Sequence, residues 1–429
     1  MLELLDLRER RERLEPRRLE IDPDVSDTVR GILARVREEG DPALLDLTLR
    51  LDGADLRGRG PVVAPEEFAN AIDGIPETVR RALDALIDRV ADLHRRQLPP
   101  EWQDERAGVR FGERVRPIRA AGCYVPGGRA VYPSSVAMTV TPAVVAGVEE
   151  IVVCTPPRAD GSIHPEVLYA ARAAGSTRVV KVGGAQAIAA MAYGTASVPA
   201  VDKVVGPGNL HVTEAKRQLA GVIGIDGLAG PTELVLVAGP DADPRWVAAD
   251  LVAQAEHDPD ALATLVALDE GVVRDVEHHL EAEVARAARR GIVERALQGA
   301  RAVLVADWEH AVEVVNDLAP EHLQLAVSSA GAFAKGVRNA GAIFVGAFTP
   351  VPFGDYGVAS NHVLPTGGTA RFASGLRASD FVKVMSVVEM SPEAAAALAP
   401  EVAELARSEG LVGHARAVEV RAEDRRRGP

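Results

Sequence analysis

The chain begins with apolar residues spaced as in amphipathic helices. In Val79–Leu93 the apolar residues recur three and four positions apart, which predicts a helix with one buried face, and Pro99 and Pro100 end the pattern. The first hundred residues have a similar pattern of apolar and polar positions, so we expect them to be helical, including a small helical extension over residues 1–20. A further helix is predicted near the other end of the chain, at Pro392–Arg407.

The middle of the chain has a different sequence pattern, in which short Val- and Ile-rich runs alternate with Ala-rich helical segments. Helices are predicted, for example, at Pro165–Ala174 and Trp246–Glu256. Strands that alternate with helices indicate an α/β protein with largely parallel sheets. The predicted strands are Ile151–Cys154, Val179–Val182, Val201–Val205, Leu234–Ala238, Thr264–Leu268, Ala302–Ala306 and Ala342–Val345.

Length and composition favour a multidomain globular protein. The chain has 429 residues, of which 47% are hydrophobic, so it is long enough for two or more domains with substantial cores. No apolar stretch approaches the roughly 20 residues that a membrane span needs. The N-terminus alternates Leu with charged residues and lacks the apolar centre of a signal peptide. We therefore expect a cytoplasmic protein that does not associate with a membrane.

Charge and cysteine content exclude several classes of partner and site. The net charge is −14, with acidic and basic residues interspersed, which argues against a nucleic-acid-binding surface and mainly favours solubility. The two cysteines are Cys123 and Cys154, and there is no CxxC motif. A disulfide framework or a thiolate zinc site is therefore not expected, and a metal would need His and carboxylate ligands.

Glycine-rich turns are concentrated between residues 122 and 230, at 125–128, 183–186 and 206–209. The second and third directly follow apolar runs, where an α/β sheet places its ligand-binding loops. The chain has neither a G-x-G-x-x-G fingerprint nor a G-x-x-x-x-G-K-[ST] phosphate loop. From the residues alone, nucleotide-binding loops and simple tight turns both stay open.

Two short segments combine residue types suited to metal binding and proton transfer. Gln254 and His257 end an apolar helical run and project from one helix face, as two ligands of one metal ion would, although an ordinary helix end also explains them. Glu321 and His322 follow Pro320 and would supply two proton-transfer groups, because the histidine pKa lies near neutrality. An exposed turn is the alternative for this second segment.

Two further segments place polar residues beside glycines. Asp355 and His362 lie in a stretch of small and polar residues, which is typical of a loop that carries a site or of a solvated surface loop. Glu409 and His414 lie close to glycines that leave both side chains unhindered, and a frayed chain end is the alternative. Asp355 and His414, together with the two residues of the helix end, would make an N/O ligand set suited to zinc.

These segments and the glycine-rich turns together resemble the histidinol dehydrogenase family, from about residue 20 to residue 420. Any one motif is weak evidence, but all of them occur in the family's order. The motifs are Tyr-Val-Pro-Gly-Gly at 124–128, Gly-Gly-Ala-Gln-Ala-Ile at 183–188, Gly-Pro-Gly-Asn at 206–209, Ala-Gly-Pro-Thr-Glu at 229–233, Gln-Ala-Glu-His-Asp-Pro-Asp at 254–260, Ala-Pro-Glu-His-Leu at 319–323, Gly-Asp-Tyr at 354–356, Asn-His-Val-Leu-Pro-Thr at 361–366 and the segment 409–414.

The resemblance implies a zinc-dependent enzyme of histidine biosynthesis that oxidises L-histidinol through the aldehyde to L-histidine with two NAD molecules. It implies the following roles: zinc ligands Gln254, His257, Asp355 and His414; the proton-transfer pair Glu321 and His322; NAD contacts Tyr124, Gln186 and Asn209; and substrate contacts Thr232, Gln254, His257, His322, Asp355, His362, Glu409 and His414.

The family fold implies two incomplete Rossmann-like domains with parallel-sheet cores and small helical extensions at both ends. The expected parts are an N-terminal extension over 1–20, a main domain over 21–123 and 232–376 that carries zinc and the acid/base residues, an NAD-binding domain over 124–231 and a C-terminal extension over 377–429. The resemblance also implies an intertwined homodimer in which Glu409 and His414 reach into the neighbouring subunit's site.

The chain departs from the family pattern at two places. Thr232 stands where the family usually has Ser, which keeps the hydroxyl and adds a methyl group. In the stretch 357–360 the glycine is displaced, which would reshape the loop that carries Asp355 and His362. A related zinc and NAD dehydrogenase for a different hydroxy or amino-alcohol substrate is therefore an alternative, although His362 and Glu409 favour histidinol.

Two alternatives involve other chemistry. A zinc hydrolase would also use zinc, Glu and His to direct water onto its substrate. A cysteine thiohemiacetal is another route for aldehyde oxidation, and Cys123, beside the first glycine-rich turn, is its better candidate, while Cys154 is expected to pack within a strand. No His or Lys near Cys123 in the sequence would activate the thiol.

Overall fold

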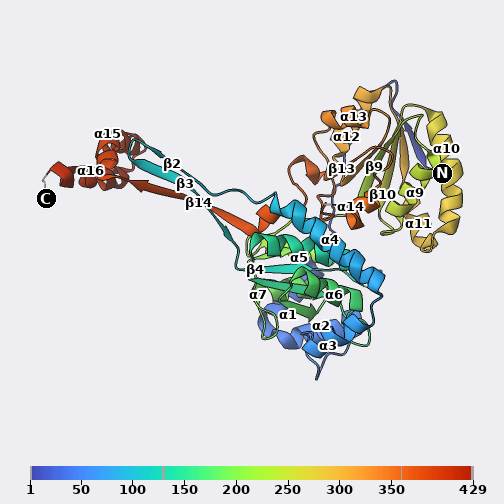
Figure 1. Cartoon of the computed structure of the whole chain (residues 1–429), viewed down its shortest axis with the longest axis horizontal. Helices are drawn as coiled ribbons and strands as arrows, with labels where there is room; N and C mark the ends of the chain where they lie inside the picture. Colours follow the sequence, from blue (N-terminus) through green and yellow to red (C-terminus); the bar gives the residue numbers. More distant parts are fainter. Residues whose placement is uncertain (1, 128–130, 359, 427–429) are drawn as a thin grey trace. The chain divides into compact units, whose positions relative to one another are not determined.

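The computed structural model of the chain describes residues 2–127, 131–358 and 360–426 (Figure 1). They form two compact units. The first comprises Met1–Gln97 and Ile118–Phe381 and contains two parallel sheets. The second comprises Leu98–Pro117 and Val382–Pro429 and contains one antiparallel sheet.

One sheet of the first unit has five parallel strands in the order β6-β5-β4-β7-β8. The chain starts at β4, continues outward through β5 and β6, and returns to β7 on the other side of β4. The strand order therefore reverses between β4 and β7, and open α/β sheets bind ligands at the carboxyl ends beside such a reversal. The strands are β4 (Ala120–Tyr124), β5 (Glu150–Thr155), β6 (Arg178–Lys181), β7 (Lys203–Val205) and β8 (Gly224–Ile225).

The helices around this sheet come from two parts of the chain. Leu33 and Leu44, on the first two helices, share a buried core with Ala189 and Val212, which lie on α7 and α8. Figure 1 shows the helices of the first hundred residues beside α5–α7. The helices are α1 (Pro23–Glu39), α2 (Asp41–Asp52), α3 (Pro65–Asp73), α4 (Glu77–Arg95), α5 (Pro133–Ala146), α6 (Pro165–Ala174), α7 (Gly184–Tyr193) and α8 (Leu210–Leu219).

The other sheet has six parallel strands in the order β1-β11-β10-β9-β12-β13. Its strand order reverses between β9 and β12. In β9, Leu234 and Leu236 pack in the core on one face and Val235 and Val237 in the core on the other, so this strand is buried on both faces and reads as an apolar run after Glu233. The strands are β1 (Glu3–Asp6), β9 (Glu233–Ala238), β10 (Leu262–Ala267), β11 (Arg301–Leu304), β12 (His322–Ala326) and β13 (Ala342–Val345).

The helices α9 to α13 lie between the strands of this sheet in the sequence, and α14, η1 and η2 follow its last strand, β13. Val247 and Leu251 of α9 pack in the core on one face of the sheet, and Val314 and Val315 of α12 pack in the core on the other. The helices are α9 (Pro244–Ala255), α10 (Glu270–Arg286), α11 (Arg290–Leu297), α12 (Trp308–Leu318), α13 (Ala330–Gly336), α14 (Val351–Tyr356) and the short 3-10 helices η1 (Thr369–Arg371) and η2 (Ala378–Phe381).

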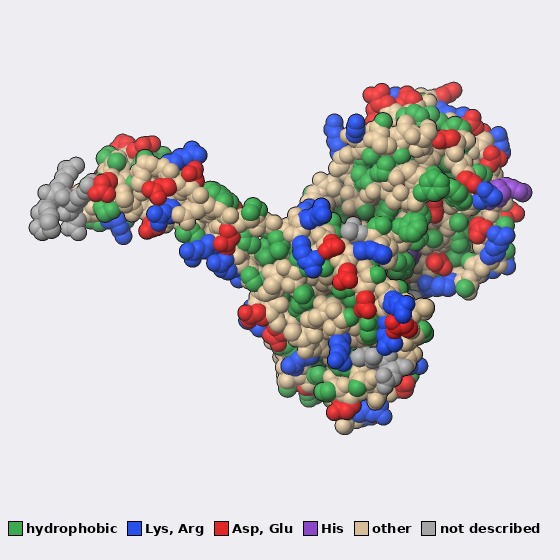
Figure 2. Space-filling model, in the orientation of Figure 1, with side chains coloured by type: hydrophobic (Ala, Val, Ile, Leu, Met, Phe, Trp, Pro, Cys, Tyr) green, Lys and Arg blue, Asp and Glu red, His purple; other side chains and the backbone are tan. Residues whose placement is uncertain are grey.

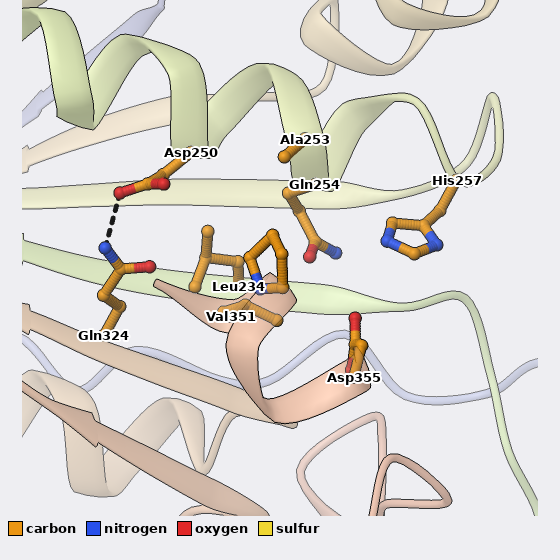
Figure 3. Close-up of a pocket in the computed structure, with 9 residues that line it drawn as sticks. Leu234, Asp250, Ala253, Gln254, His257, Gln324, Val351 and Asp355 are labelled. Atoms are coloured by element: carbon orange, nitrogen blue, oxygen red, sulfur yellow. Dashed lines mark hydrogen bonds between the residues drawn. The ribbon is translucent and has the colours of Figure 1, made fainter. Parts of the chain in front are cut away.

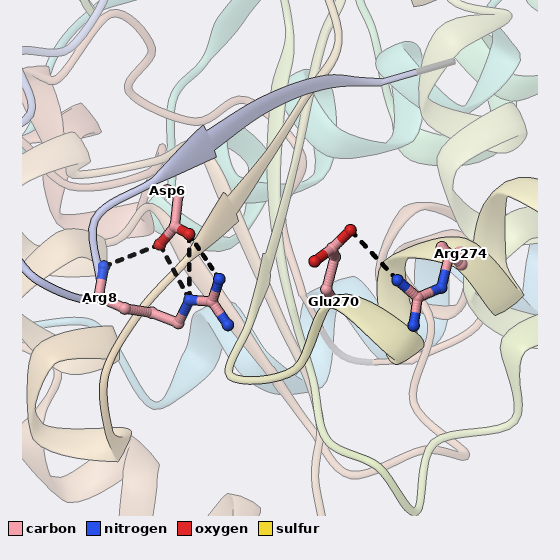
Figure 4. A network of polar contacts seen from close by, with 4 residues as sticks. All are labelled: Asp6, Arg8, Glu270 and Arg274. Carbon is pink, nitrogen blue, oxygen red and sulfur yellow. Dashed lines mark hydrogen bonds and ion pairs between the residues drawn. The ribbon is translucent and has the colours of Figure 1, made fainter.

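The predicted helical extension over residues 1–20 is wrong. Glu3–Asp6 forms β1, which pairs in parallel with β11, and the part of residues 7–20 that follows contains no helix or strand. A neighbouring strand edge stabilises the extended chain here, which the spacing of Leu and charge does not reveal. Asp6 then accepts hydrogen bonds from Arg8, while Glu270, in the first turn of α10, pairs with Arg274 (Figure 4).

The predicted domain boundaries differ from the observed packing in two respects. Although residues 21–123 were expected in the main domain, α1 and α2 share the core of the five-stranded sheet and β4 is its central strand. In addition, Leu98–Pro117 joins the C-terminal part of the chain in the second unit. Both differences arise because contacts between distant segments determine which domain a segment belongs to, whereas the sequence pattern shows only local periodicity.

The second unit is built on an antiparallel sheet of order β14-β3-β2, with β2 (Trp102–Arg106), β3 (Val109–Pro117) and β14 (Val382–Met390). Two helices follow in the sequence, α15 (Pro392–Ser408) and α16 (Val412–Arg426), and they pack on each other. The predicted helix Pro392–Arg407 is thus confirmed. Several apolar side chains of this unit are exposed, among them Val388, Leu405 and Val412.

The predicted α/β class with parallel sheets is confirmed, as is each predicted strand within a residue or two. The helices predicted at Val79–Leu93, Pro165–Ala174 and Trp246–Glu256 correspond to α4, α6 and α9. On the face in Figure 2, acidic and basic side chains are interspersed. Within the described ranges, no helix has both the length and the apolar character required to cross a bilayer.

Candidate active site

Thr232 and Glu321 meet at the amino ends of two neighbouring parallel strands. Thr232 directly precedes β9 and Glu321 directly precedes β12, and these strands pair with His322 opposite Leu234. The Thr232 hydroxyl donates to Oε2 of Glu321 at 2.7 Å, and the backbone N–H of Glu233 donates to the same oxygen at 2.9 Å. The expectation that these residues share a site agrees with this geometry, whereas the exposed-turn alternative for Glu321 does not, because its side chain is buried.

Burial gives Glu321 proton affinity suited to acid–base chemistry. It raises the pKa of Glu321 to about 7, and the hydrogen bonds from Thr232 and from the Glu233 backbone limit the rise because they stabilise the carboxylate. A carboxyl group with a pKa near neutrality can both accept and release a proton at physiological pH.

His322 is a buried imidazole with both ring nitrogens available. Its Nδ1 lies 3.5 Å from Oε2 of Glu321, and its ring lies beside that of Phe344 with centroids 6.1 Å apart. Neither nitrogen has a hydrogen-bond partner among the residues that the structure describes. Burial lowers the pKa of His322, which favours the neutral ring that can accept a proton from a ligand.

Gln254, His257 and Asp355 line one pocket between α9 and α14 (Figure 3). Gln254 lies in the last turn of α9 and His257 just beyond its end, while Asp355 lies on α14. The Nε2 atom of Gln254 donates to the Thr232 hydroxyl at 3.1 Å, which connects this pocket to Glu321. Burial lowers the pKa of His257 and raises that of Asp355 to about 6, so removal from water perturbs both groups.

The donor atoms of this pocket fit part of a zinc site. Amide and carboxylate oxygens and a neutral imidazole nitrogen are N/O ligands that zinc accepts. In the described part of the chain, no three His, Cys, Asp or Glu side chains gather closely enough to hold a metal ion. The three predicted ligands of the first unit therefore offer an incomplete set, and His414, the fourth, belongs to the second unit.

His362 lies close to the same residues. Its Nδ1 is 3.9 Å from Oδ1 of Asp355, and its Nε2 is 3.2 Å from the Ser135 hydroxyl on α5. Burial, together with the nearby rings of His322 and His257, lowers the pKa of His362 to about 3. The preceding Asn361 holds this segment through a 2.8 Å hydrogen bond to the carbonyl of Met138.

The three residues predicted to contact NAD lie at the carboxyl end of the five-stranded sheet. Tyr124 ends β4, Gln186 lies in the first turn of α7 after β6, and Asn209 caps α8 after β7. The Gly184 N–H donates to the Tyr124 hydroxyl at 3.1 Å. In the described structure, Oε1 of Gln186 is buried without a partner, which fits a ligand that donates a hydrogen bond to it.

The glycine-rich turns bring backbone close to these residues. A side chain at Gly206 would meet the carbonyl oxygen of Tyr124 at 2.1 Å, and Gly206 has a φ of +115°. This glycine therefore permits the first and third turns to approach each other. The predicted Tyr-Val-Pro-Gly-Gly motif extends to Gly128, which lies outside the described residues, as does Ala359 of the stretch 357–360.

The two cysteines are unsuited to covalent catalysis. Both are fully buried, and burial raises the pKa of Cys123 to about 12 and that of Cys154 still further. A nucleophilic thiol needs surroundings that lower its pKa. The thiohemiacetal alternative is therefore not supported.

Glu409 and His414 belong to a different unit from the other predicted site residues, and they come later in the sequence. Glu409 follows α15 and His414 lies in the first turn of α16, both in the second unit, and both are exposed. Their predicted roles in substrate and zinc binding stay predictions.

Some residues of the site were missed by the sequence analysis. Gln324 lies two positions after His322 in a buried strand, and a polar residue in an otherwise apolar strand was the available signal. Asp250 lies one helical turn before Gln254 on α9, and this spacing places both on one helix face. Glu233 accepts a 2.8 Å hydrogen bond from the Gly367 N–H, and its burial and proximity to Glu321 raise its pKa to about 8.

Comparisons with known proteins agree on one family. The family model described as histidinol dehydrogenase matches residues 15–422. The histidinol dehydrogenase of Brucella melitensis is 46% identical over 404 residues, covering 94% of each chain, and that of Moorella thermoacetica is 46% identical over 425 residues, covering 99% of this chain and 100% of the relative. The crystal structure of histidinol dehydrogenase from Elizabethkingia anophelis superposes with a TM-score of 0.94 at 32% identity, covering 99% of this chain and 98% of that one.

Proposed function

The chain belongs to the histidinol dehydrogenase family, and from this membership we propose that it oxidises L-histidinol through the aldehyde to L-histidine, with two NAD molecules and one zinc ion per subunit. The observation that carries the proposal is the Thr232 hydroxyl, which contacts both the buried Glu321 and Gln254 of the polar pocket. One hydroxyl thus connects the proposed proton-transfer pair with the proposed metal ligands.

His322 acts in the first oxidation. Its neutral imidazole would accept the hydroxyl proton of the alcohol while a bound NAD would supply the hydride acceptor, which would give the aldehyde. The lowered pKa of His322 keeps the ring unprotonated at neutral pH, and both ring nitrogens are without a partner in the described structure, so the ring is ready to accept that proton.

Glu321 acts in the second oxidation. Its carboxylate takes a proton from a water molecule as that water attacks the aldehyde carbon, which gives a geminal diol. Once Glu321 has released that proton to solvent, its carboxylate would accept the hydroxyl proton of the diol, and a second bound NAD would supply the hydride acceptor, so that the carboxylic acid results. The pKa of Glu321, raised by burial to about 7, matches this function.

Gln254, His257 and Asp355 would hold the zinc ion, with His414 as a fourth ligand. When bound, zinc supplies a positive charge that orients nitrogen donors of the substrate, and it has no redox chemistry of its own. In the same pocket, Thr232 and His362 would contact the substrate, and Glu409 would recognise its imidazole group.

Tyr124, Gln186 and Asn209 would bind NAD, which supplies the hydride acceptor when bound. Support comes from their common location at the carboxyl ends of β4, β6 and β7, beside the reversal of strand order. The buried Oε1 of Gln186, which has no partner within the described ranges, is a ready acceptor for a cofactor hydroxyl or amide.

We propose further that the protein is an intertwined homodimer in which Glu409 and His414 complete the neighbouring subunit's site. The second unit exposes apolar side chains, including Val388 at 65%, Leu405 at 64% and Val412 at 66%. Exposed apolar surface on so small a unit favours a protein partner, and a second copy is the simplest one.

Turnover tests the activity directly. NADH formation and histidine production are measured with L-histidinol and NAD, before and after zinc is removed by a chelator and after zinc is restored. The proposal expects two NADH per histidine and loss of activity on chelation. Hydrolysis without NADH formation would favour the zinc hydrolase, and NADH formation only with another amino alcohol would favour the related dehydrogenase.

Subunit mixing tests the shared site. The activity measured is histidine production from L-histidinol, and Glu321→Gln and Glu409→Gln subunits are each expected to lack it as homodimers. In a mixed dimer one site would combine both intact residues, so random mixing should restore about a quarter of wild-type activity. Absence of any restoration in dimers shown to be mixed would contradict sharing.

A further inference from the structure

A carboxylate oxygen without a hydrogen-bond partner in the described structure lies near the proposed NAD residues. Asp52 is the last residue of α2, and its Oδ2 atom is buried with no hydrogen-bond partner in the described chain. Burial is the main cause that raises the pKa of Tyr124, and the negative charge of Asp52 adds to the rise, so the two side chains are close enough to interact. A buried carboxylate oxygen without a donor is unfavourable, and a ligand that donates hydrogen bonds would remove this cost.

The segment after Asp52 locates it at the carboxyl end of the five-stranded sheet. Val62 forms an antiparallel bridge with Val180 of β6, and the Lys181 N–H donates to the carbonyl of Pro61 at 2.7 Å. Because the bridge is antiparallel, the residues before Pro61 continue past the carboxyl end of β6. Arg59 confirms this direction, since it donates to the carbonyl of Asp160, beyond the end of β5.

This end of the sheet lacks the acidic residue that a Rossmann-type site normally uses. In such sites, an Asp or Glu after the second strand accepts a hydrogen bond from a ribose hydroxyl and disfavours a 2′-phosphate. Here the second strand, β5, ends at Thr155 and is followed by Pro156 and Pro157. The next acid, Asp160, already accepts a 2.6 Å hydrogen bond from the Ser162 hydroxyl.

From this juxtaposition we propose that Asp52 accepts hydrogen bonds from a ribose hydroxyl of the dinucleotide and selects NAD over NADP. The inference rests on the proposed function, because it requires a dinucleotide at these loops. Two acceptors, Oδ2 of Asp52 and Oε1 of Gln186, are buried without partners in the described structure. A ribose diol offers two O–H donors, whereas a 2′-phosphate would bring negative charge toward the carboxylate.

Binding measurements on the whole protein, with the metal present, test the inference. NADH and NADPH are titrated by fluorescence, and apo-protein unfolding is followed by heating, for wild type, Asp52→Asn and Asp55→Asn. Asp55 is the matched control, because it lies three positions away, is exposed and pairs with Arg57. We expect Asp52→Asn to weaken NADH binding roughly tenfold or more, since charge-assisted hydrogen bonds are lost. The ratio of the NADPH and NADH dissociation constants should decrease as well.

Thermal unfolding separates a binding role from a structural one. Since the Oδ2 atom of Asp52 is buried without a partner in the described structure, Asp52→Asn should keep or raise the unfolding temperature of the apo-protein while reducing the increase that NADH produces. Asp55→Asn should bind like wild type. The inference is overturned if wild type binds NADH and Asp52→Asn binds it equally well with the same selectivity. If wild type binds neither dinucleotide, the proposed cofactor itself is wrong.

Discussion

Thr232 donates a 2.7 Å hydrogen bond to Glu321, which lies 89 positions later in the sequence. The same hydroxyl accepts a hydrogen bond from Gln254 at 3.1 Å. Threonine therefore provides both contacts with its oxygen, although the family usually has serine here. The departure from the family pattern leaves the connection between Glu321 and the pocket intact.

Replacing Thr232 by a residue without a hydroxyl group should slow aldehyde oxidation. Thr232→Val keeps the shape of the side chain but removes a hydrogen bond to a carboxylate, which is worth about 1.5–3 kcal/mol. The rate of NADH formation from histidinal should fall about 10- to 100-fold. Thr232→Ser is the control and should stay near wild type, and equal losses in both variants would contradict the role of the hydroxyl.

Glu321 and His322 should separate the two oxidations. Glu321→Gln should lower the rate of aldehyde oxidation by roughly 10²–10⁴-fold while NADH formation from the alcohol stays largely intact. His322→Asn should instead lower the alcohol step by a similar factor. Single-turnover measurements that start from histidinol and from histidinal distinguish the two, and equal loss of both halves in Glu321→Gln would refute its water-activating role.

The zinc content of the His322→Asn variant is a second readout. His322 is proposed to transfer a proton and not to bind metal, so the purified variant should retain one zinc ion per subunit, as measured by metal analysis. Loss of zinc in His322→Asn, with normal zinc in Glu321→Gln, would move His322 into the ligand set.

Aldehyde oxidation should depend on the ionisation of Glu321. Burial raises the pKa of Glu321 to about 7, and only its carboxylate form accepts a proton from water. The rate should therefore rise about tenfold per pH unit below pH 7 and level off above it. In Thr232→Val the midpoint should move to higher pH, because the hydrogen bond that lowers this pKa is absent. An unchanged midpoint would assign the titration to another group.

The sequence predicted the regular elements where local pattern and tertiary structure agree. The predicted strands Ile151–Cys154 and Leu234–Ala238 are apolar and short, and they correspond to β5 and β9, respectively. β1 was missed because its pairing partner, β11, lies nearly 300 positions later in the chain, as Glu3 opposite Arg301 shows. β14 and β3 pair over an equally long separation, so no local pattern could place Leu98–Pro117 with the C-terminal part.

For the site, the sequence indicated residue types and order but not proximity. Helical spacing predicted that Gln254 and His257 lie close together. Thr232 and Glu321, in contrast, meet only because β9 and β12 are neighbours in the sheet. The resemblance to a family supplied those assignments. Gln324 and Asp250 were missed because their contact depends on the packing of α9 against the sheet, which no local pattern reports.

The contact between Gln324 and Asp250 should contribute to stability. Nε2 of Gln324 donates to Oδ2 of Asp250, and both side chains line the pocket beside Gln254 (Figure 3). Gln324→Leu would leave the half-buried Asp250 carboxyl without this donor, which should lower the free energy of unfolding by about 1–3 kcal/mol. Because burial raises the pKa of Asp250 to about 6, the loss should be larger at pH 8, where the group is charged, than at pH 5.

A double-mutant cycle separates this contact from general effects of the substitution. The control Asp250→Asn keeps the shape without the charge, and urea unfolding of both single variants and of Asp250→Asn/Gln324→Leu is compared at the two pH values. The double variant should recover part of the stability that Gln324→Leu loses at pH 8, since no charge is then buried without a donor. Strict additivity of the two substitutions would show that the hydrogen bond does not couple α9 to β12.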